Sequence, residues 1–132
     1  MVRLVYDKPL YEMANLQAST IGERFELWLD EAGKDRNVGH NLPRFKPKAN
    51  GVELDIVIDG DTVRFDKANT SKPRKFKYGK DAIKFVEKFK KALLLHWNKK
   101  IDTFKLGMII YLVNKKHYSV DAAINDVLND NF

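Results

Sequence analysis

The stretch that decides the fold is VELDIVIDGDTVRFD, residues 52–66. Apolar side chains occupy every second position at its start, which is the pattern of a half-buried strand. The acid-glycine-acid triplet at 59–61 then predicts a tight turn, because glycine adopts the positive φ that a hairpin needs. The alternation resumes after the turn. The stretch therefore predicts a hairpin of two antiparallel strands, residues 52–58 and 62–67.

Two segments upstream of the hairpin also favour extended structure. Residues 23–30 place Phe25, Leu27 and Leu29 on one side, which predicts a further half-buried strand. Residues 42–48 are extended in character as well. The two prolines in that segment favour an edge strand or a loop, because proline cannot donate to a sheet ladder.

The other segments favour helices, apart from one short alternating run at residues 2–6. Residues 10–18 follow a proline and predict two helical turns. Residues 79–98 repeat apolar side chains every 3.6 positions, which predicts a long helix with its aromatic face on the sheet. Residues 103–116 and 119–129 predict a helical pair, and the serine at the start of the second suits an N-cap.

These elements predict an α+β fold, in which a small antiparallel sheet is covered by the long helix. Short turns between consecutive strands favour antiparallel over parallel pairing. A chain of 132 residues fits one domain. We divide this single domain, 1–132, into an N-terminal segment at 1–22, a sheet with its long helix at 23–101, and a helical extension at 102–132.

The charge of the chain is concentrated in one region. Eleven basic residues and two acidic ones lie between Lys72 and Lys100, a formal charge of +9. The whole chain carries +6, so the remainder nets −3. Such asymmetry favours a polyanionic or acidic partner.

Composition excludes several classes of protein. The chain has no cysteine, which rules out disulfides, cysteine zinc sites and thiol catalysis, and is typical of a reducing cytoplasm. The longest apolar run, residues 108–113, is far too short to cross a bilayer. The first residues lack the apolar stretch of a secretory signal. We therefore expect a cytoplasmic protein with no membrane partner.

The predicted polyanion-binding surface combines the long helix with the loop before it. Lysines four residues apart fall on one side of a helix, where they can contact several phosphates in succession. The alternative is a solvated face on which lysine only maintains solubility. The aromatic residues of this loop, Phe76 and Tyr78, suit either base stacking or anchoring in the core. The candidate residues are Lys72, Arg74, Lys75, Lys77, Lys80, Lys84, Lys88 and Lys91.

A secondary basic loop offers the one candidate for catalysis. His40 lies close in sequence to Arg44, Lys46 and Lys48. A histidine with cationic neighbours is able to cleave RNA without a metal, so a toxin-like ribonuclease using His40 with Arg44 and Lys46 is an alternative function. A lone histidine in a loop is more often simply exposed. No serine stands in a nucleophile motif.

Metal and adaptor functions have weaker signals. The aspartates around the predicted turn match no calcium loop, and the three histidines share no ligand spacing, so we expect no metal and no cofactor. A protein–protein adaptor is a third function to consider. It would use apolar surface left outside the core by Leu94, Leu95 and Tyr111.

Residues 23–98 resemble a family in their order of elements and in scattered motif residues. The chain has His40, Pro43 and Phe45 in a loop and strand, then Leu93 and Trp97 near the end of the long helix. This outline is similar to the small bacterial proteins grouped as domain of unknown function four-one-six-zero, often encoded near toxin–antitoxin-like genes. The family usually has histidines on both sides of the phenylalanine, where this chain has arginine and lysine. The resemblance implies a fold and no activity.

The sequence as a whole favours a small non-enzymatic cytoplasmic binding protein. Its basic loop and helix would dock on a polyanion, either nucleic acid or an acidic protein surface. Such a protein suits an accessory or defence-related role in a bacterium or phage. The oligomeric state stays open.

Overall fold

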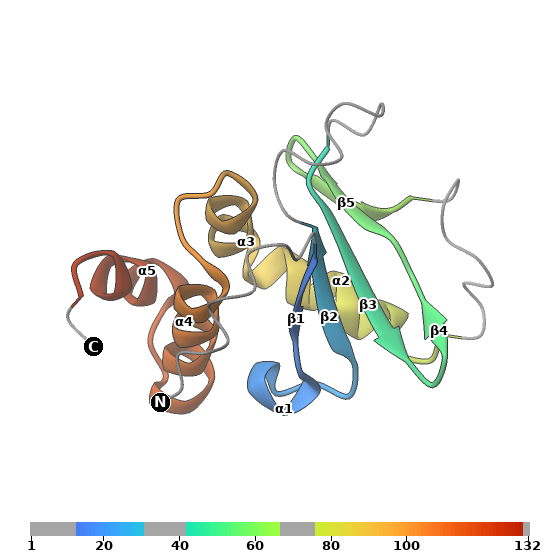
Figure 1. The fold of residues 1–132 in the computed structure, drawn as a ribbon, viewed down its shortest axis with the longest axis horizontal. Coiled ribbons are helices and arrows are strands. Elements are labelled where there is room, and N and C mark those ends of the chain that lie inside the picture. The colour runs from blue at the N-terminus through green and yellow to red at the C-terminus, as the bar shows by residue number, and fades with distance from the viewer. Residues whose placement is uncertain (1–12, 31–41, 67–75, 131–132) are drawn as a thin grey trace.

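The computed structural model describes residues 13–30, 42–66 and 76–130, and within them it has six strands and five helices (Figure 1). The class is α+β, as the sequence predicts. In chain order the elements are β1 (Met13–Leu16), α1 (Ala18–Ile21), β2 (Glu26–Asp30), β3 (Arg44–Ala49), β4 (Val52–Glu53), β5 (Ile56–Asp59), β6 (Thr62–Phe65), α2 (Gly79–Lys88), α3 (Lys90–Trp97), α4 (Thr103–Lys116) and α5 (Val120–Leu128).

The strands form one antiparallel sheet in the order β1-β2-β3-β5-β6, and β4 also pairs with β3. The predicted hairpin is confirmed as β5 and β6, which turn at Gly60 with φ of 62°. Its first strand is interrupted, because residues 52–53 and 56–59 are separate strands on the same side of β3.

Pro47 explains that interruption. It lies opposite Leu54, whose N–H donates to the Pro47 carbonyl at 3.0 Å, but proline has no N–H to return. Pro43 is used in the same way, since its carbonyl accepts from Ile58 at 3.0 Å. The expectation of an edge strand or loop at 42–48 is therefore wrong. β3 lies inside the sheet because its prolines stand where their carbonyls alone are used.

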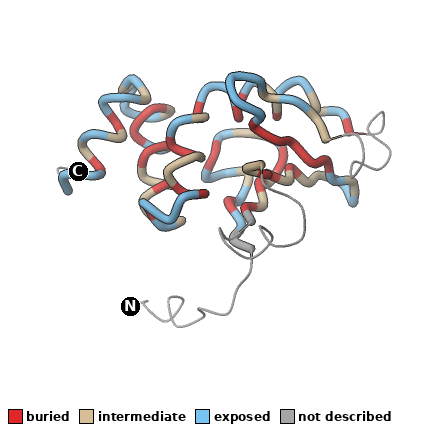
Figure 2. The backbone as a smooth tube through the Cα atoms, turned by 90° about the horizontal axis from the view of Figure 1, so that it is seen from above, coloured by how far each residue is buried: buried red, intermediate tan, exposed pale blue. Residues whose placement is uncertain are grey.

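One face of the sheet holds the core against the helices. Leu27, Phe45 and Ile56 point to this face and are buried under α2. Phe85 of α2 meets Phe25 edge-on with ring centroids 6.3 Å apart. In Figure 2 the helical turns alternate between buried and exposed positions, as amphipathic helices do.

The predicted long helix at 79–98 is present as two helices that meet at Phe89. This residue has φ of −100° and ψ of 19°, yet its N–H still donates to the Phe85 carbonyl at 3.0 Å. Its ring is buried and lies 4.8 Å from that of Phe85. The backbone therefore bends locally while the apolar face stays continuous across α2 and α3.

The predicted C-terminal helical pair is confirmed. Asp102 caps α4 by accepting from the Lys105 N–H at 2.8 Å, and Ser119 caps α5 by accepting from the Ala122 N–H at 3.1 Å. α4 packs beside β1 and α1, and α5 lies on its outer side (Figure 1). Among the described helices none has the length and hydropathy to cross a bilayer.

The helix predicted at residues 10–18 is wrong. Residues 13–16 form β1, which pairs with β2 in the register Leu16 opposite Leu27. Burial of Leu16 against the sheet outweighs the helical propensity of this short segment. Only 18–21 make a helical turn. The strand predicted at residues 2–6 lies outside the described residues.

Candidate anion-binding surface and pocket

The lysines of α2 and α3 form an exposed basic face, as their spacing predicts. We define it as Lys77, Lys80, Lys84, Lys88 and Lys91, all of which are exposed. The opposite side of α2 is anchored in the core by Ala82, Phe85 and Val86. The ammonium groups are thus presented to solvent because the apolar side of the same helix is held by the sheet.

Most of the basic face is not neutralised within the described part of the chain. There, no carboxylate lies in ion-pair contact with Lys77, Lys80, Lys84 or Lys88. Lys91 is the exception, since its Nζ lies 2.8 Å from Oδ1 of Asp121 in α5. Both partners of that pair are largely exposed, and such pairs contribute little and exchange readily.

Acidic groups nearby reduce the potential of the basic face without cancelling it. Asp81 and Glu87 lie exposed on the same helix. Burial raises the pKa of Glu23, with a further rise from Asp81 and an opposing effect from the charge of Lys88. Glu23 thus lies within electrostatic range of Lys88. α2 and α3 together still carry five lysines against two carboxylates.

The loop part of the predicted surface is only partly described. Lys72, Arg74 and Lys75 lie outside the described residues. Phe76 is buried, with its ring 6.3 Å from Phe25 and 6.0 Å from Tyr78. Phe76 therefore serves as a core anchor, one of the two roles that the sequence allows.

Arg44 is a strand residue and not part of a basic loop. It opens β3 and is only 6% exposed. Its Nη1 lies 2.9 Å from Oδ2 of Asp55 and 2.6 Å from Oδ2 of Asp66. Two carboxylates of the same chain therefore hold the guanidinium that the sequence assigns to phosphate.

Electrostatics in this cluster follow from burial and pairing. Burial disfavours the charged form of Arg44, but hydrogen bonds and the charges of Asp66 and Asp55 outweigh this and raise its pKa. Burial also raises the pKa of Asp55, against the opposing charges of Lys46 and Arg44. The sequence expects Asp55 to point outward and to be available to Arg64. Instead Arg64 lies across from Val57 and pairs with Asp59 at 3.0 Å.

The two lysines of β3 are also engaged in the sheet. Lys46 is half-buried and stands opposite Trp28 of β2. Lys48 places its Nζ 4.2 Å from the centroid of the Trp28 ring and 3.4 Å from Oε1 of Glu53. His40, the candidate base of a ribonuclease, lies outside the described residues. The secondary basic loop is therefore, where it is described, a strand with its cations paired.

The residues suggested for an adaptor surface separate into two groups. Leu94 and Leu95 are half-buried and pack against the core. Tyr111 is 44% exposed on α4, as is Phe104 at 55% on the same helix. Within the described residues, no group of three or more metal-ligating side chains comes together.

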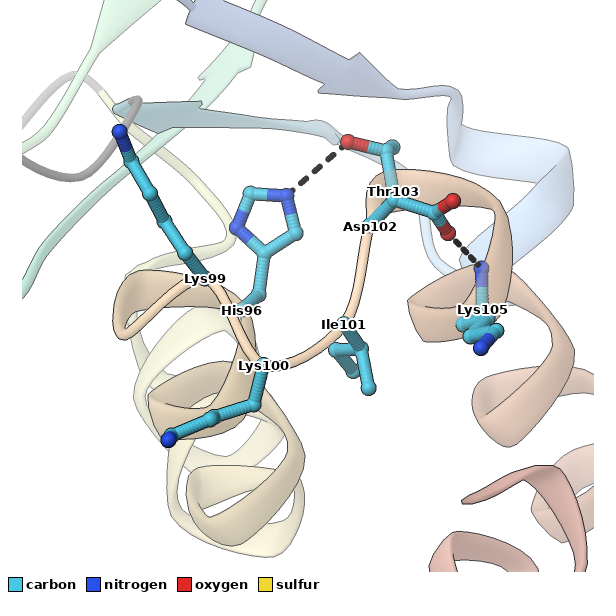
Figure 3. A pocket seen from close by; sticks show the side chains of 7 residues that line it. All are labelled: His96, Lys99, Lys100, Ile101, Asp102, Thr103 and Lys105. Atoms are coloured by element: carbon cyan, nitrogen blue, oxygen red, sulfur yellow. Dashed lines mark hydrogen bonds between the residues drawn. The ribbon is translucent and has the colours of Figure 1, made fainter. Parts of the chain in front are cut away.

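A pocket between α3 and α4 is the feature that sequence reasoning misses (Figure 3). We call it the α3–α4 pocket, and its volume is about 400 Å³. It forms where the chain leaves α3, turns through Lys99 at φ of 61° and enters α4. Its lining residues are His96, Lys99, Lys100, Ile101, Asp102, Thr103 and Lys105.

His96 forms a buried wall of the α3–α4 pocket, consistent with the core role that the sequence predicts. It is 5% exposed, and its Nε2 lies 3.0 Å from Oγ1 of Thr103. Within the described residues its Nδ1 has no hydrogen-bond partner. Burial lowers the pKa of His96, and the charge of Asp102 opposes that shift. The ring is therefore neutral at neutral pH.

Comparisons with protein-family models, with curated proteins and with solved structures find no match for this chain. The resemblance to the bacterial family in residues 23–98 therefore stays a prediction. What can be inferred about function depends on the geometry of the basic face and of the α3–α4 pocket.

Proposed function

We propose that this protein is a non-enzymatic nucleic-acid-binding module, and that its basic face docks on the phosphate backbone. The observation that carries the proposal is the row Lys80, Lys84 and Lys88, exposed and without ion pairs in the described part of the chain. Its ends are eight residues apart, about 12 Å at 1.5 Å per residue. That length matches about three to four phosphates along one strand.

The chemistry of the basic face favours a nucleic acid over an acidic protein. Lysine is a point charge that follows a regular row of phosphates, whereas protein interfaces rely on buried aromatic and arginine anchors. The described arginine with the best bidentate geometry, Arg44, is held by carboxylates within the sheet. Contacts made by ammonium groups alone carry no base information, so binding is expected to be independent of sequence.

The proposal is tested by charge reversal on two matched helical sites. Lys80→Glu/Lys84→Glu changes the basic face, and Lys115→Glu/Lys116→Glu makes the same change at exposed positions near the end of α4. Fluorescence anisotropy follows binding to single- and double-stranded oligonucleotides between about 50 and about 200 mM salt. Wild-type affinity should fall steeply over this range.

We expect the first variant to lose most of its affinity and to flatten the salt dependence by about 0.9 in log–log slope per lost contact with duplex DNA. The control should change affinity only modestly through net charge. No wild-type binding at about 50 mM salt, where phosphate contacts are strongest, would reject a nucleic-acid partner. Equal losses in both variants would show non-specific attraction instead of a defined face.

A further inference from the structure

The α3–α4 pocket concentrates positive charge that the described residues do not neutralise. Lys99, Lys100 and Lys105 line it together with a single carboxylate, Asp102. None of the three lysines has an ion pair within the described part of the chain. The Asp102 carboxylate accepts from the backbone N–H of Lys105 and thus caps α4 (Figure 3). The pocket is therefore suited to an anion.

The start of α4 adds to this potential. This helix has 14 residues, and its N-terminal end carries partial positive charge. The N–H groups of Lys105 and Leu106 are used by the side chain and the carbonyl of Asp102. Within the described residues the N–H groups of Thr103 and Phe104 have no hydrogen-bond partner. Helix ends of this kind are common sites for phosphate.

His96 is the independent sign that the pocket takes a ligand. Its ring projects between Lys99 and Thr103 (Figure 3), and Nδ1 is a buried polar atom without a partner in the described residues. A buried polar atom left unpaired is unfavourable. Because the hydroxyl of Thr103 is able to donate to Nε2, the proton of the neutral ring is free to reside on Nδ1. An anionic oxygen would then satisfy that N–H.

We propose that the α3–α4 pocket binds a phosphate monoester, supplied by the phosphorylated end of a nucleic-acid strand. This rests on the proposed function. A monoester carries close to two negative charges at neutral pH, whereas each bridging phosphate of a strand carries one. Three ammonium groups against one carboxylate match the more highly charged group. A pocket of about 400 Å³ is in the range of small-ligand sites.

The two basic regions then have different tasks. The basic face of α2 and α3 would follow the backbone of the strand. The α3–α4 pocket would distinguish a phosphorylated end from a hydroxyl end. Free inorganic phosphate offers the same chemistry as a strand end, so the test compares both sources.

The experiment uses the full chain and one oligonucleotide sequence with a 5′-phosphate, a 3′-phosphate or hydroxyl ends. We expect wild type to bind one of the phosphorylated strands about tenfold more tightly than the hydroxyl strand, the size of one charged hydrogen bond. Lys99→Gln/Lys100→Gln should abolish this preference while still binding the hydroxyl strand. Lys115→Gln/Lys116→Gln, equally exposed lysines on α4, should keep it.

Histidine NMR distinguishes occupation of the pocket from general attraction. Addition of the preferred strand should shift the ring resonances of His96 more than those of exposed His117, and inorganic phosphate should compete. Equal affinity of wild type for all three strands would overturn the proposal, even if the hydroxyl strand bound well and the proposed function stood. If inorganic phosphate shifted His96 but no strand bound, both the strand end and the proposed function would be rejected.

Discussion

Two sets of cations in this molecule have the same formal charge and opposite fates. Arg44 stands in the sheet with its guanidinium against Asp55 and Asp66, whereas Lys80, Lys84 and Lys88 stand on α2 without a carboxylate in ion-pair contact among the described residues. The difference comes from position. β3 brings Arg44 within reach of two strands' worth of acids, while α2 has solvent on its outer side. Local charge in the sequence therefore does not predict which cations are available to a partner.

The largest expected effect comes from breaking the buried set. Arg44→Met leaves Asp55 and Asp66 without their shared cation, and we expect a loss of about 3 to 5 kcal/mol in unfolding free energy. Urea denaturation measures it. Lys84→Met, which removes an exposed cation, should change stability by less than about 0.5 kcal/mol. Similar values for the two variants would mean that burial does not separate the two sets.

An intermediate effect concerns His96, a buried group that loses its charge. Its folded pKa lies below the ordinary 6.5 because of burial, so in the window just below 6.5 the unfolded chain binds a proton that the folded chain does not. Stability should therefore fall as the pH drops through that window. The charges that face this ring are Asp102 and the lysines of the α3–α4 pocket.

Thermal unfolding of wild type and His96→Gln at several pH values between about 7 and about 5.5 isolates this contribution. We expect a weaker pH dependence in the variant. Asp55 and Glu23, whose pKa values burial raises, act with the opposite sign above their ordinary values and remain in both proteins. Parallel curves for the two proteins would show that His96 is not the titrating group.

The smallest expected effect sharpens the boundary of the exposed set. Asp121→Asn releases Lys91 from its ion pair with little change in unfolding free energy, below about 1 kcal/mol, because both partners are exposed. Nucleic-acid affinity should rise a few-fold. Asp126→Asn on the same helix makes the same charge change without an ion pair to break. If both variants gained affinity equally, Lys91 would not belong to the binding face.

Elements with a strong local period were predictable in outline. The β5–β6 hairpin follows from alternation around Gly60, and α5 follows from its apolar spacing and the cap at Ser119. The segment at residues 10–18 was not predictable in this way. There the pairing of β1 with β2 and the burial of Leu16 decide a conformation that local propensity alone leaves ambiguous.

The candidate sites differ in the same respect. The lysine row is a periodic signal on a single helix, so its exposed face was predictable from spacing. The α3–α4 pocket was not, because it depends on how the chain reverses at Lys99 and where Thr103 meets His96. A pair of lysines at a helix end, followed by an aspartate N-cap, is the signal that would have drawn attention to it.

The amino-acid sequence by itself determined the class of fold, the hairpin, the helical pair and the concentration of lysine along one helix, because each is a pattern of neighbouring residues. The tertiary structure alone decided that Arg44 is neutralised, that Pro43 and Pro47 lie inside a sheet, and that lysines from two helix ends share a pocket with a buried imidazole. The physical reason is that pairing and desolvation depend on groups far apart in the chain, which only packing brings together.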